Sequence, residues 1–206
     1  MAVRSGRLMN PVGLNTAPRD PIAPRLDRLD GKVIGLLDNS KKNADLLLKA
    51  IGALLSSEHH VAGIVYHRKV GSSPAAPAAM LDDLAARCDA VINAYGDCGS
   101  CTSWCVHDGV TLERRGIPTA TVNSDAFVVL GQQEAIALGL PGLPIVTVPH
   151  PMGDVAADVV QERARAMLAQ VLAVLTTDAE TLESQYTDRF ITGADAFVRA
   201  GMVCEI

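Results

Sequence analysis

The sequence predicts an open, mainly parallel, doubly wound α/β sheet with helices on both faces. Short apolar runs bounded by Gly, Pro, Asn or Asp alternate with longer segments of helical periodicity. This alternation of strand and helix implies a parallel sheet covered on both sides. The length of 206 residues suits about one domain. Because 49% of the residues are apolar, the chain can form a sizeable core.

The first half of the chain contains three predicted strands. Residues 32–37 form an apolar run that ends at Asp38 and Asn39, and residues 61–66 and 89–94 read as the second and third strands. A Gly/Ser/Pro loop is expected over 70–77, and a short helix over 78–88. The segment 43–56 shows the apolar spacing of a helix with one buried face, at Leu46, Leu47, Ala50, Ile51, Leu54 and Leu55.

The second half continues the same alternation. A helix is expected over 106–115, where Gly116 is a suitable C-cap, and another over 126–138, which Gly139 ends. Strands are predicted over 117–122 and 143–148, followed by a long helix over 154–175. These elements predict a flavodoxin-like or Rossmann-like domain over 29–175. An N-terminal arm over 1–28 and a C-terminal extension over 176–206 have no assigned structure.

Composition excludes several classes of function. The net charge of −5 and an aromatic content of 3% argue against nucleic-acid binding, which favours clustered basic and stacking residues. No apolar run reaches the length of about 18 residues needed to cross a bilayer, so no membrane association is expected. No signal peptide is evident. Five cysteines, three of them clustered, suit reactive thiols in a reducing cytoplasm better than a disulfide framework.

The cysteine cluster is the most informative motif. Three of the five cysteines and the single tryptophan lie in a short segment after the third predicted strand. In such sheets a strand-to-helix turn lies at the carboxyl edge, where ligands bind. A helix N-terminus favours the thiolate, so Cys98 is the candidate nucleophile and Cys101 the resolving thiol. Gly99 can adopt the backbone conformation that brings the two sulfur atoms together.

Polar residues follow four of the predicted strands, whose carboxyl ends meet at one edge of the sheet. His150 or His107 is the candidate acid or base. Asp97 precedes the nucleophile, and either orients it or raises its pKa by like-charge repulsion. The predicted catalytic set is Cys98, Cys101, His150, His107 and Asp97. The predicted substrate-binding set is Asp38, Asn39, Gly96, Gly99, Ser100, Thr102 and Asn123.

Other interpretations of these residues are structural. Cys88 and Cys204 are expected in the core, because free cysteine is often buried. Asp38 and Asn39 can also cap the following helix. Three cysteines and a histidine have the residue types of a zinc site, but the chain lacks a second Cys-x-x-Cys. We therefore predict no metal ligands and no bound cofactor, and favour neither zinc nor an iron–sulfur cluster.

The motifs resemble the UGSC family, named for selenocysteine-Gly-Ser-Cys, with cysteine replacing selenocysteine in many members. The resemblance covers about residues 29–153 and rests on residues 96–104, His107-Asp108, Glu113, Gly116-Ile117-Pro118-Thr119 and Pro149-His150-Pro151. More distantly, the same elements resemble the selenoprotein subunit of protein B of glycine, sarcosine and betaine reductases.

The resemblance implies a reactive chalcogen at position 98. In the reductases, the selenol attacks an activated α-carbon, and a partner protein processes the adduct. This chain has sulfur at Cys98, supplies no pyruvoyl-bearing subunit, and spaces Cys105 one residue further from Cys101 than the reductase pattern does. These departures prevent a direct transfer of the reductase reaction.

The sequence therefore predicts a cytoplasmic, cysteine-dependent oxidoreductase that displaces or reductively cleaves a group on a small activated substrate. Its expected partners are that small molecule and a thiol reductant or reductase protein, and a homo-oligomer is compatible with the sequence. One alternative is a non-redox cysteine lyase or hydrolase. Another is a thiol- or metal-binding carrier subunit of a reductase complex.

Overall fold

The computed structural model describes residues 19–191, which form a five-stranded parallel sheet. The strand order β2-β1-β3-β4-β5 is that of flavodoxin-like folds, so the predicted fold class is confirmed. Each strand overlaps its predicted range. The strands are β1 Val33–Asp38, β2 Gly63–Arg68, β3 Ala90–Gly96, β4 Thr119–Ser124 and β5 Ile145–Val148.

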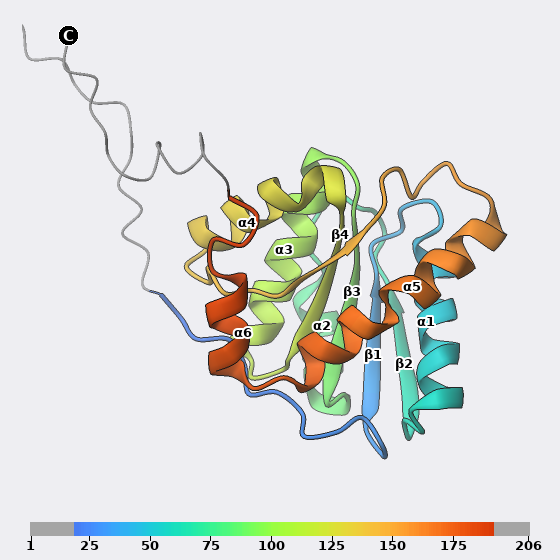
Figure 1. Cartoon of the computed structure of the whole chain (residues 1–206), viewed down its shortest axis with the longest axis horizontal. Coiled ribbons are helices and arrows are strands. Elements are labelled where there is room, and N and C mark those ends of the chain that lie inside the picture. Colours follow the sequence, from blue (N-terminus) through green and yellow to red (C-terminus); the bar gives the residue numbers. More distant parts are fainter. Residues whose placement is uncertain (1–18, 192–206) are drawn as a thin grey trace, which may run out of the picture.

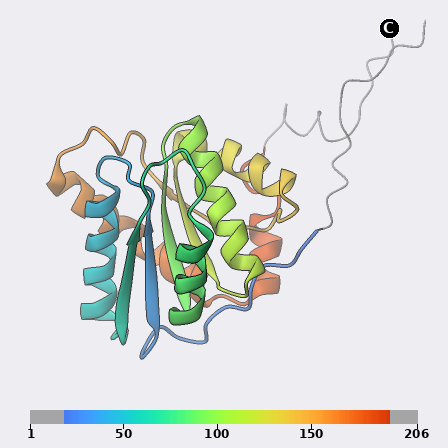
Figure 2. The same ribbon diagram turned by 180° about the vertical axis from the view of Figure 1, so that it is seen from behind.

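Helices cover both faces of this sheet. Figure 1 shows α1 (Ala44–Glu58) and α5 (Ala157–Thr176) in front of the strands. Figure 2, turned by 180°, shows α2 (Ala78–Arg87) and α3 (Gly99–Arg114) in front. A short 3-10 turn, η1 (Asp125–Phe127), leads into α4 (Val128–Ala137), and α6 (Ala179–Tyr186) follows α5.

Helix α3 begins earlier than its sequence pattern indicates. The apolar periodicity predicted a helix from Val106, but the helix begins at Gly99, and the N–H of Thr102 donates to the carbonyl of Cys98 at 3.0 Å. Gly, Ser, Thr and Cys are weak helix formers, so residues 99–105 show no helical signal. Packing of Cys101 and Cys105 against the sheet stabilises this first part of the helix.

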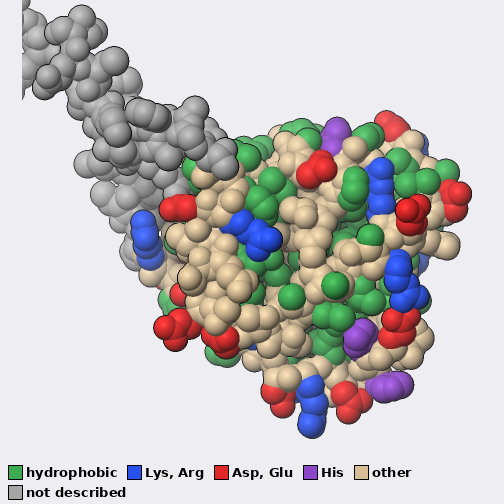
Figure 3. Space-filling view, in the orientation of Figure 1, with side chains coloured by type: hydrophobic (Ala, Val, Ile, Leu, Met, Phe, Trp, Pro, Cys, Tyr) green, Lys and Arg blue, Asp and Glu red, His purple; other side chains and the backbone are tan. Residues whose placement is uncertain are grey.

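The core lies mainly between the sheet and its helices. All seven residues of β3 are buried, as expected for the central strand of a covered parallel sheet. One hydrophobic cluster joins the sheet to α1 and α5, and a smaller cluster lies beneath α2. Each fully buried Leu or Ile side chain contributes about 1.5–3 kcal/mol. On the α1/α5 face, acidic and basic side chains are intermixed (Figure 3).

The described parts of both flanking segments pack onto this core. Ile22 and Ala23 of the predicted arm are buried, and so are Leu182 and Tyr186 of α6. The N–H of Ile22 donates to Glu183 Oε1 at 2.7 Å, which joins the two segments. The remainder of the predicted arm and extension, including Cys204, lies outside the described residues. Across residues 19–191, no helix combines the length and apolar character that a membrane crossing requires.

Candidate active site

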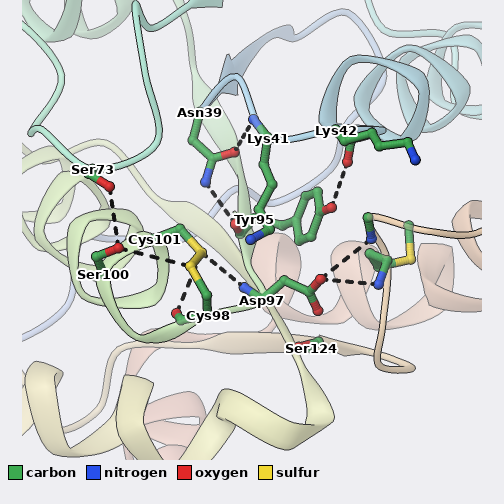
Figure 4. Close-up of a disulfide and its surroundings, with 12 residues drawn as sticks. Asn39, Lys41, Lys42, Ser73, Tyr95, Asp97, Cys98, Ser100, Cys101 and Ser124 are labelled. Carbon is green, nitrogen blue, oxygen red and sulfur yellow. Dashed lines mark hydrogen bonds between the residues drawn. A yellow bond between two sulfur atoms is a disulfide. The ribbon is translucent and has the colours of Figure 1, made fainter.

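The two cysteines of the predicted pair are joined by a disulfide at the start of α3 (Figure 4). Their Cα atoms are 5.6 Å apart, within the range that a disulfide requires. Cys98 is the N-cap of α3 and is half-buried, whereas Cys101 has 0% exposure. An attacking group from solvent therefore reaches the sulfur of Cys98 before that of Cys101.

The residues between the two cysteines are open to solvent. Gly99 and Ser100 are exposed, and a side chain added at Gly99 would meet no atom within 4 Å. Ser100 Oγ lies 3.9 Å from Cys98 Sγ and 3.3 Å from Ser73 Oγ of the β2–α2 loop. The N-cap residue Cys98 makes no side-chain capping hydrogen bond, so the partial positive charge at the N-terminus of α3 is available to a Cys98 thiolate.

Asp97 connects the cysteine turn to His150. The backbone N–H of Asp97 donates to Cys101 Sγ at 3.4 Å, while its Oδ1 lies 2.7 Å from His150 Nδ1. Its Oδ2 accepts the N–H groups of Met152 and Gly153 at 3.3 and 3.4 Å. These contacts orient the histidine, and they favour an orienting role for Asp97 over simple repulsion of the nucleophile.

His150 therefore lies beside the cysteine turn, as the convergence of strand ends predicted. Adjacent Cα atoms are about 3.8 Å apart, so the Asp97–His150 contact places the ring within about 10 Å of the Cys98 Cα atom. Ser124 Oγ, at the end of β4, is 3.2 Å from His150 Nδ1. The Phe127 ring lies 5.7 Å from the imidazole, centroid to centroid.

The Pro149–Pro151 turn is held by Arg163, which sequence reasoning missed, and by Asp125, one of the polar residues that follow the fourth predicted strand. Arg163 of α5 donates through Nη1 to the carbonyls of Pro149 and Pro151 at 2.9 and 2.7 Å. Asp125 Oδ1 accepts the N–H of His150 at 3.0 Å. The His150–Pro151 peptide bond is cis. No sequence pattern marks Arg163, because its partners are backbone carbonyls brought near by the fold.

His107 is not brought to this site. It lies nine residues beyond Cys98 in the same helix, which corresponds to roughly 13 Å along the helix axis. Its ring packs against Trp104, with centroids 5.1 Å apart. Of the two candidate histidines, His150 is the one that contacts Asp97 beside the cysteine turn, because the rise along α3 carries His107 away from the carboxyl edge.

Asp38 and Asn39 at the end of β1 are engaged in framework hydrogen bonds. Asn39 Nδ2 donates to the carbonyl of Tyr95 at 2.7 Å. The Asp38 carboxylate accepts from Tyr66 Oη and from the N–H of Ser40. Both residues are fully buried. Asn39 therefore supports the backbone that leads into the cysteine turn, whereas Asp38 ties the end of β1 to Tyr66 of β2. Their predicted contact with substrate is corrected to these supporting roles.

Gly96, Thr102 and Asn123 lie beneath the turn. Thr102 and Asn123 have 0% exposure. A Cβ atom on Gly96 would stand 2.4 Å from Asn123 Oδ1 and 2.6 Å from Thr102 Oγ1, so only glycine fits there. The predicted substrate-binding role of these three residues is corrected to close packing between β3, β4 and α3. Of the predicted set, Gly99 and Ser100 are the residues exposed beside Cys98.

The remaining described cysteines are packing residues. Cys105 is fully buried, and its thiol donates to Asn93 Oδ1 at 3.2 Å. Burial raises the pKa of the Cys105 thiol, and it raises the pKa of Cys88 to about 11. The core position expected for Cys88 is confirmed. Within residues 19–191, no three His, Cys, Asp or Glu side chains are grouped to hold a metal ion.

Known proteins resemble this chain in sequence and in fold. The model of the UGSC family matches residues 7–177. A crystal structure of the flavodoxin-like domain of a Synechococcus sp. protein is similar at 14% sequence identity, with a TM-score of 0.37. That similarity covers 70% of this chain and 98% of the other. A search among curated proteins found no match.

Proposed function

The chain belongs to the UGSC family, and we propose that it is a cysteine-dependent oxidoreductase acting on a small activated substrate. Cys98 is the nucleophile, Cys101 the resolving thiol and His150 the acid or base. One observation carries this proposal: the Cys98–Cys101 pair at the N-terminus of α3 adjoins the Asp97–His150 pair. The cytoplasm, where thiols are kept reduced, is the compartment that suits this chemistry.

The nucleophilic role of Cys98 follows from its access and its electrostatic surroundings. The attacking species is the thiolate, which the N–H groups at the start of α3 favour. Cys98 is also the more accessible sulfur of the pair, and the exposed Gly99 and Ser100 leave room for a small molecule beside it. Burial raises the pKa values of Cys88 and Cys105, which makes both poor nucleophiles at neutral pH.

His150 supplies the proton transfer. Its Nδ1 faces the Asp97 carboxylate, so the other ring nitrogen is left to exchange a proton with the thiol or with a leaving group. A carboxylate that holds one imidazole nitrogen fixes both the tautomer and the ring orientation. This arrangement resembles a cysteine–histidine–carboxylate triad in which the carboxylate comes from the residue before the nucleophile.

Two bond-forming steps complete the proposed reaction. The Cys98 thiolate attacks the activated atom of the substrate, a covalent adduct forms, and the displaced group leaves with a proton from His150. The Cys101 thiolate then attacks Cys98 Sγ, which forms the disulfide and breaks the bond from Cys98 to the substrate fragment. The fragment leaves with the bonding electron pair and takes up a proton, so it is reduced by two electrons. The two cysteines are oxidised by the same two electrons.

Alkylation of the fully reduced protein tests the assignment. We expect iodoacetamide to modify Cys98 first at pH 7, as mapped by mass spectrometry. With a pKa of about 11, Cys88 has about one thiolate per thousand molecules at pH 8, so its rate should rise about tenfold per pH unit. His150→Ala should slow modification of Cys98 at pH 7. His107→Ala is the control and should not slow it, because the His107 ring packs against Trp104 away from the cysteine turn. If Cys88 or Cys204 reacts first, Cys98 is not the activated thiol.

A further inference from the structure

An uncharged surface borders the disulfide. Residues 70–79, which we call the collar, contain no Asp, Glu, Lys, Arg or His, although 20% of the chain is charged. Val70 is 99% exposed, and Pro74 and Ala75 are also exposed. Ser73 Oγ lies 3.3 Å from Ser100 Oγ, which in turn lies 3.9 Å from Cys98 Sγ. Figure 4 shows Ser73 above Ser100 at the edge of the cysteine turn.

A buried ion pair holds the collar in place. Lys69 Nζ donates to Asp108 Oδ2 at 2.6 Å, and the N–H of Ala76 donates to Asp108 Oδ1 at 2.8 Å. Both charged side chains are 1% exposed. One carboxylate on α3 therefore fixes both ends of the loop. Buried ion pairs add little net stability but require one geometry, so this pair keeps the exposed apolar residues of the loop ordered beside Cys98.

We propose that the collar is the docking surface for a small dithiol protein that reduces the Cys98–Cys101 disulfide. The inference rests on the proposed function, because turnover leaves this disulfide oxidised. A reductant must bring its sulfur into bonding distance of Cys98 Sγ, so its surface must lie against Ser100 and Ser73. Exposed apolar residues without charges suit an apolar protein surface around a dithiol. The collar itself offers no cation to the carboxylates of glutathione.

The reduction balances as two thiol–disulfide exchanges. A thiolate of the partner attacks Cys98 Sγ, the accessible sulfur, and the Cys98–Cys101 bond breaks. Cys101 leaves as a thiolate, to which the N–H of Asp97 already donates at 3.4 Å, and then takes up a proton. The second partner thiolate attacks the partner sulfur of the mixed disulfide, and Cys98 leaves. The partner is oxidised by two electrons, and its two thiol protons balance those gained by Cys98 and Cys101.

The test uses thioredoxin, its reductase and NADPH as the probe, with the oxidised full-length protein as substrate. We expect one equivalent of NADPH to be consumed per disulfide. The Cys98–Cys101 disulfide should be reduced faster by thioredoxin than by the same concentration of glutathione. A thioredoxin whose resolving cysteine is serine should be trapped on Cys98, as mapped by mass spectrometry. Equal rates with glutathione, or trapping on Cys101, would overturn the proposal.

The double variant Val70→Asp/Ala75→Asp tests the surface itself. Both side chains are exposed, so the fold should be retained, which circular dichroism checks. Charges on the collar should slow reduction by thioredoxin by about tenfold, while reduction by dithiothreitol stays unchanged. Leu46→Asp, at an exposed apolar residue of α1 on the opposite face, controls for added charge and should have no effect. An unchanged thioredoxin rate in the double variant would remove the collar as the docking surface.

These measurements need no substrate. They can therefore disprove the docking surface without disproving the proposed function, and the reverse. If Cys98 is the activated thiol but the collar variant reacts normally with thioredoxin, the docking surface alone is wrong. If thioredoxin reduction depends on the collar while Cys98 shows no preferential alkylation, the catalytic assignment alone is wrong.

Discussion

The two ends of helix α3 differ in solvent exposure and in hydrogen bonding. At its N-terminus, the Cys98 side chain makes no capping hydrogen bond and is half-buried, and Gly99 and Ser100 are exposed. At its C-terminus, Glu113 accepts hydrogen bonds from the N–H of Ala23, from Arg25 and from both the N–H and the hydroxyl of Thr119, all between 2.7 and 3.0 Å. One end has exposed residues beside Cys98, whereas at the other end the Glu113 carboxylate is fully engaged in hydrogen bonds.

This difference separates residues that the family resemblance placed together. Glu113 and Thr119 belong to the same motif set as Cys98 and His150, yet they lie at the closed edge of the sheet, where β4 begins. Glu113 joins the N-terminal segment, α3 and β4 through one buried carboxylate with 0% side-chain exposure. Its role is therefore stability, while the proposed chemistry lies at the opposite end of the helix.

The largest expected effect is at the open end, in the cysteine pair. With one equivalent of hydrogen peroxide, the reduced wild-type protein should form the Cys98–Cys101 disulfide. Cys101→Ser should instead accumulate a sulfenic acid on Cys98, because no resolving thiol is present, and dimedone labelling with mass mapping measures it. Cys98→Ser should show no labelling in this segment. If Cys101→Ser shows no sulfenic acid on Cys98, or turns over a substrate without loss, the pair is not a redox pair.

The next largest effect is on stability, at the closed end. Glu113→Ala should lower the free energy of unfolding by about 3–5 kcal/mol, because it leaves Arg25 buried without its partner. Urea unfolding followed by circular dichroism measures the change. Asp20→Asn, which removes the exposed ion pair to Arg114 on the same part of α3, is the matched control and should cost at most about 1 kcal/mol. A small loss in Glu113→Ala would contradict the structural role.

At the open end, Asp97→Asn separates two roles of the carboxylate. If Asp97 orients His150, the variant should slow alkylation of Cys98 at pH 7 by about a hundredfold, a size typical of lost acid–base assistance. If the carboxylate acts mainly by repelling the thiolate, the rate should rise instead. The contacts to His150, Met152 and Gly153 favour the decrease.

The smallest effect is expected for Arg163, which acts through the backbone of the His150 turn. Arg163→Met should slow Cys98 alkylation at pH 7 by about tenfold, and Arg163→Lys should restore part of the rate, because an ammonium can still bind one of the two carbonyls. Arg165→Met, on the same helix but paired with Glu58, should leave the rate unchanged. Equal rates in the two methionine variants would show that Arg163 does not position the histidine.

Local patterns in the sequence were sufficient for the fold class, all five strands and the position of the cysteine turn. Parallel strands read as continuous apolar runs because both of their faces are buried. Cys98 and His150 could be placed at one edge because every strand of a parallel sheet ends there. The turn after the third strand indicated a helix N-terminus at the cysteine pair, but the apolar periodicity marks α3 only from Val106, since residues 99–105 have weak intrinsic helix propensity and are helical because they pack on the sheet.

Only the tertiary structure decided which polar residues face solvent at that edge. Asn39 and Asn123 follow strands in the same way, yet one supports the Tyr95 carbonyl and the other lies buried beside Gly96. Side-chain direction at a strand end depends on the local twist and on neighbouring elements, which no single segment encodes. The position of His150 beside the cysteine turn, and the hydrogen bonds of Arg163 to its turn, likewise come from contacts between segments that are distant in the chain.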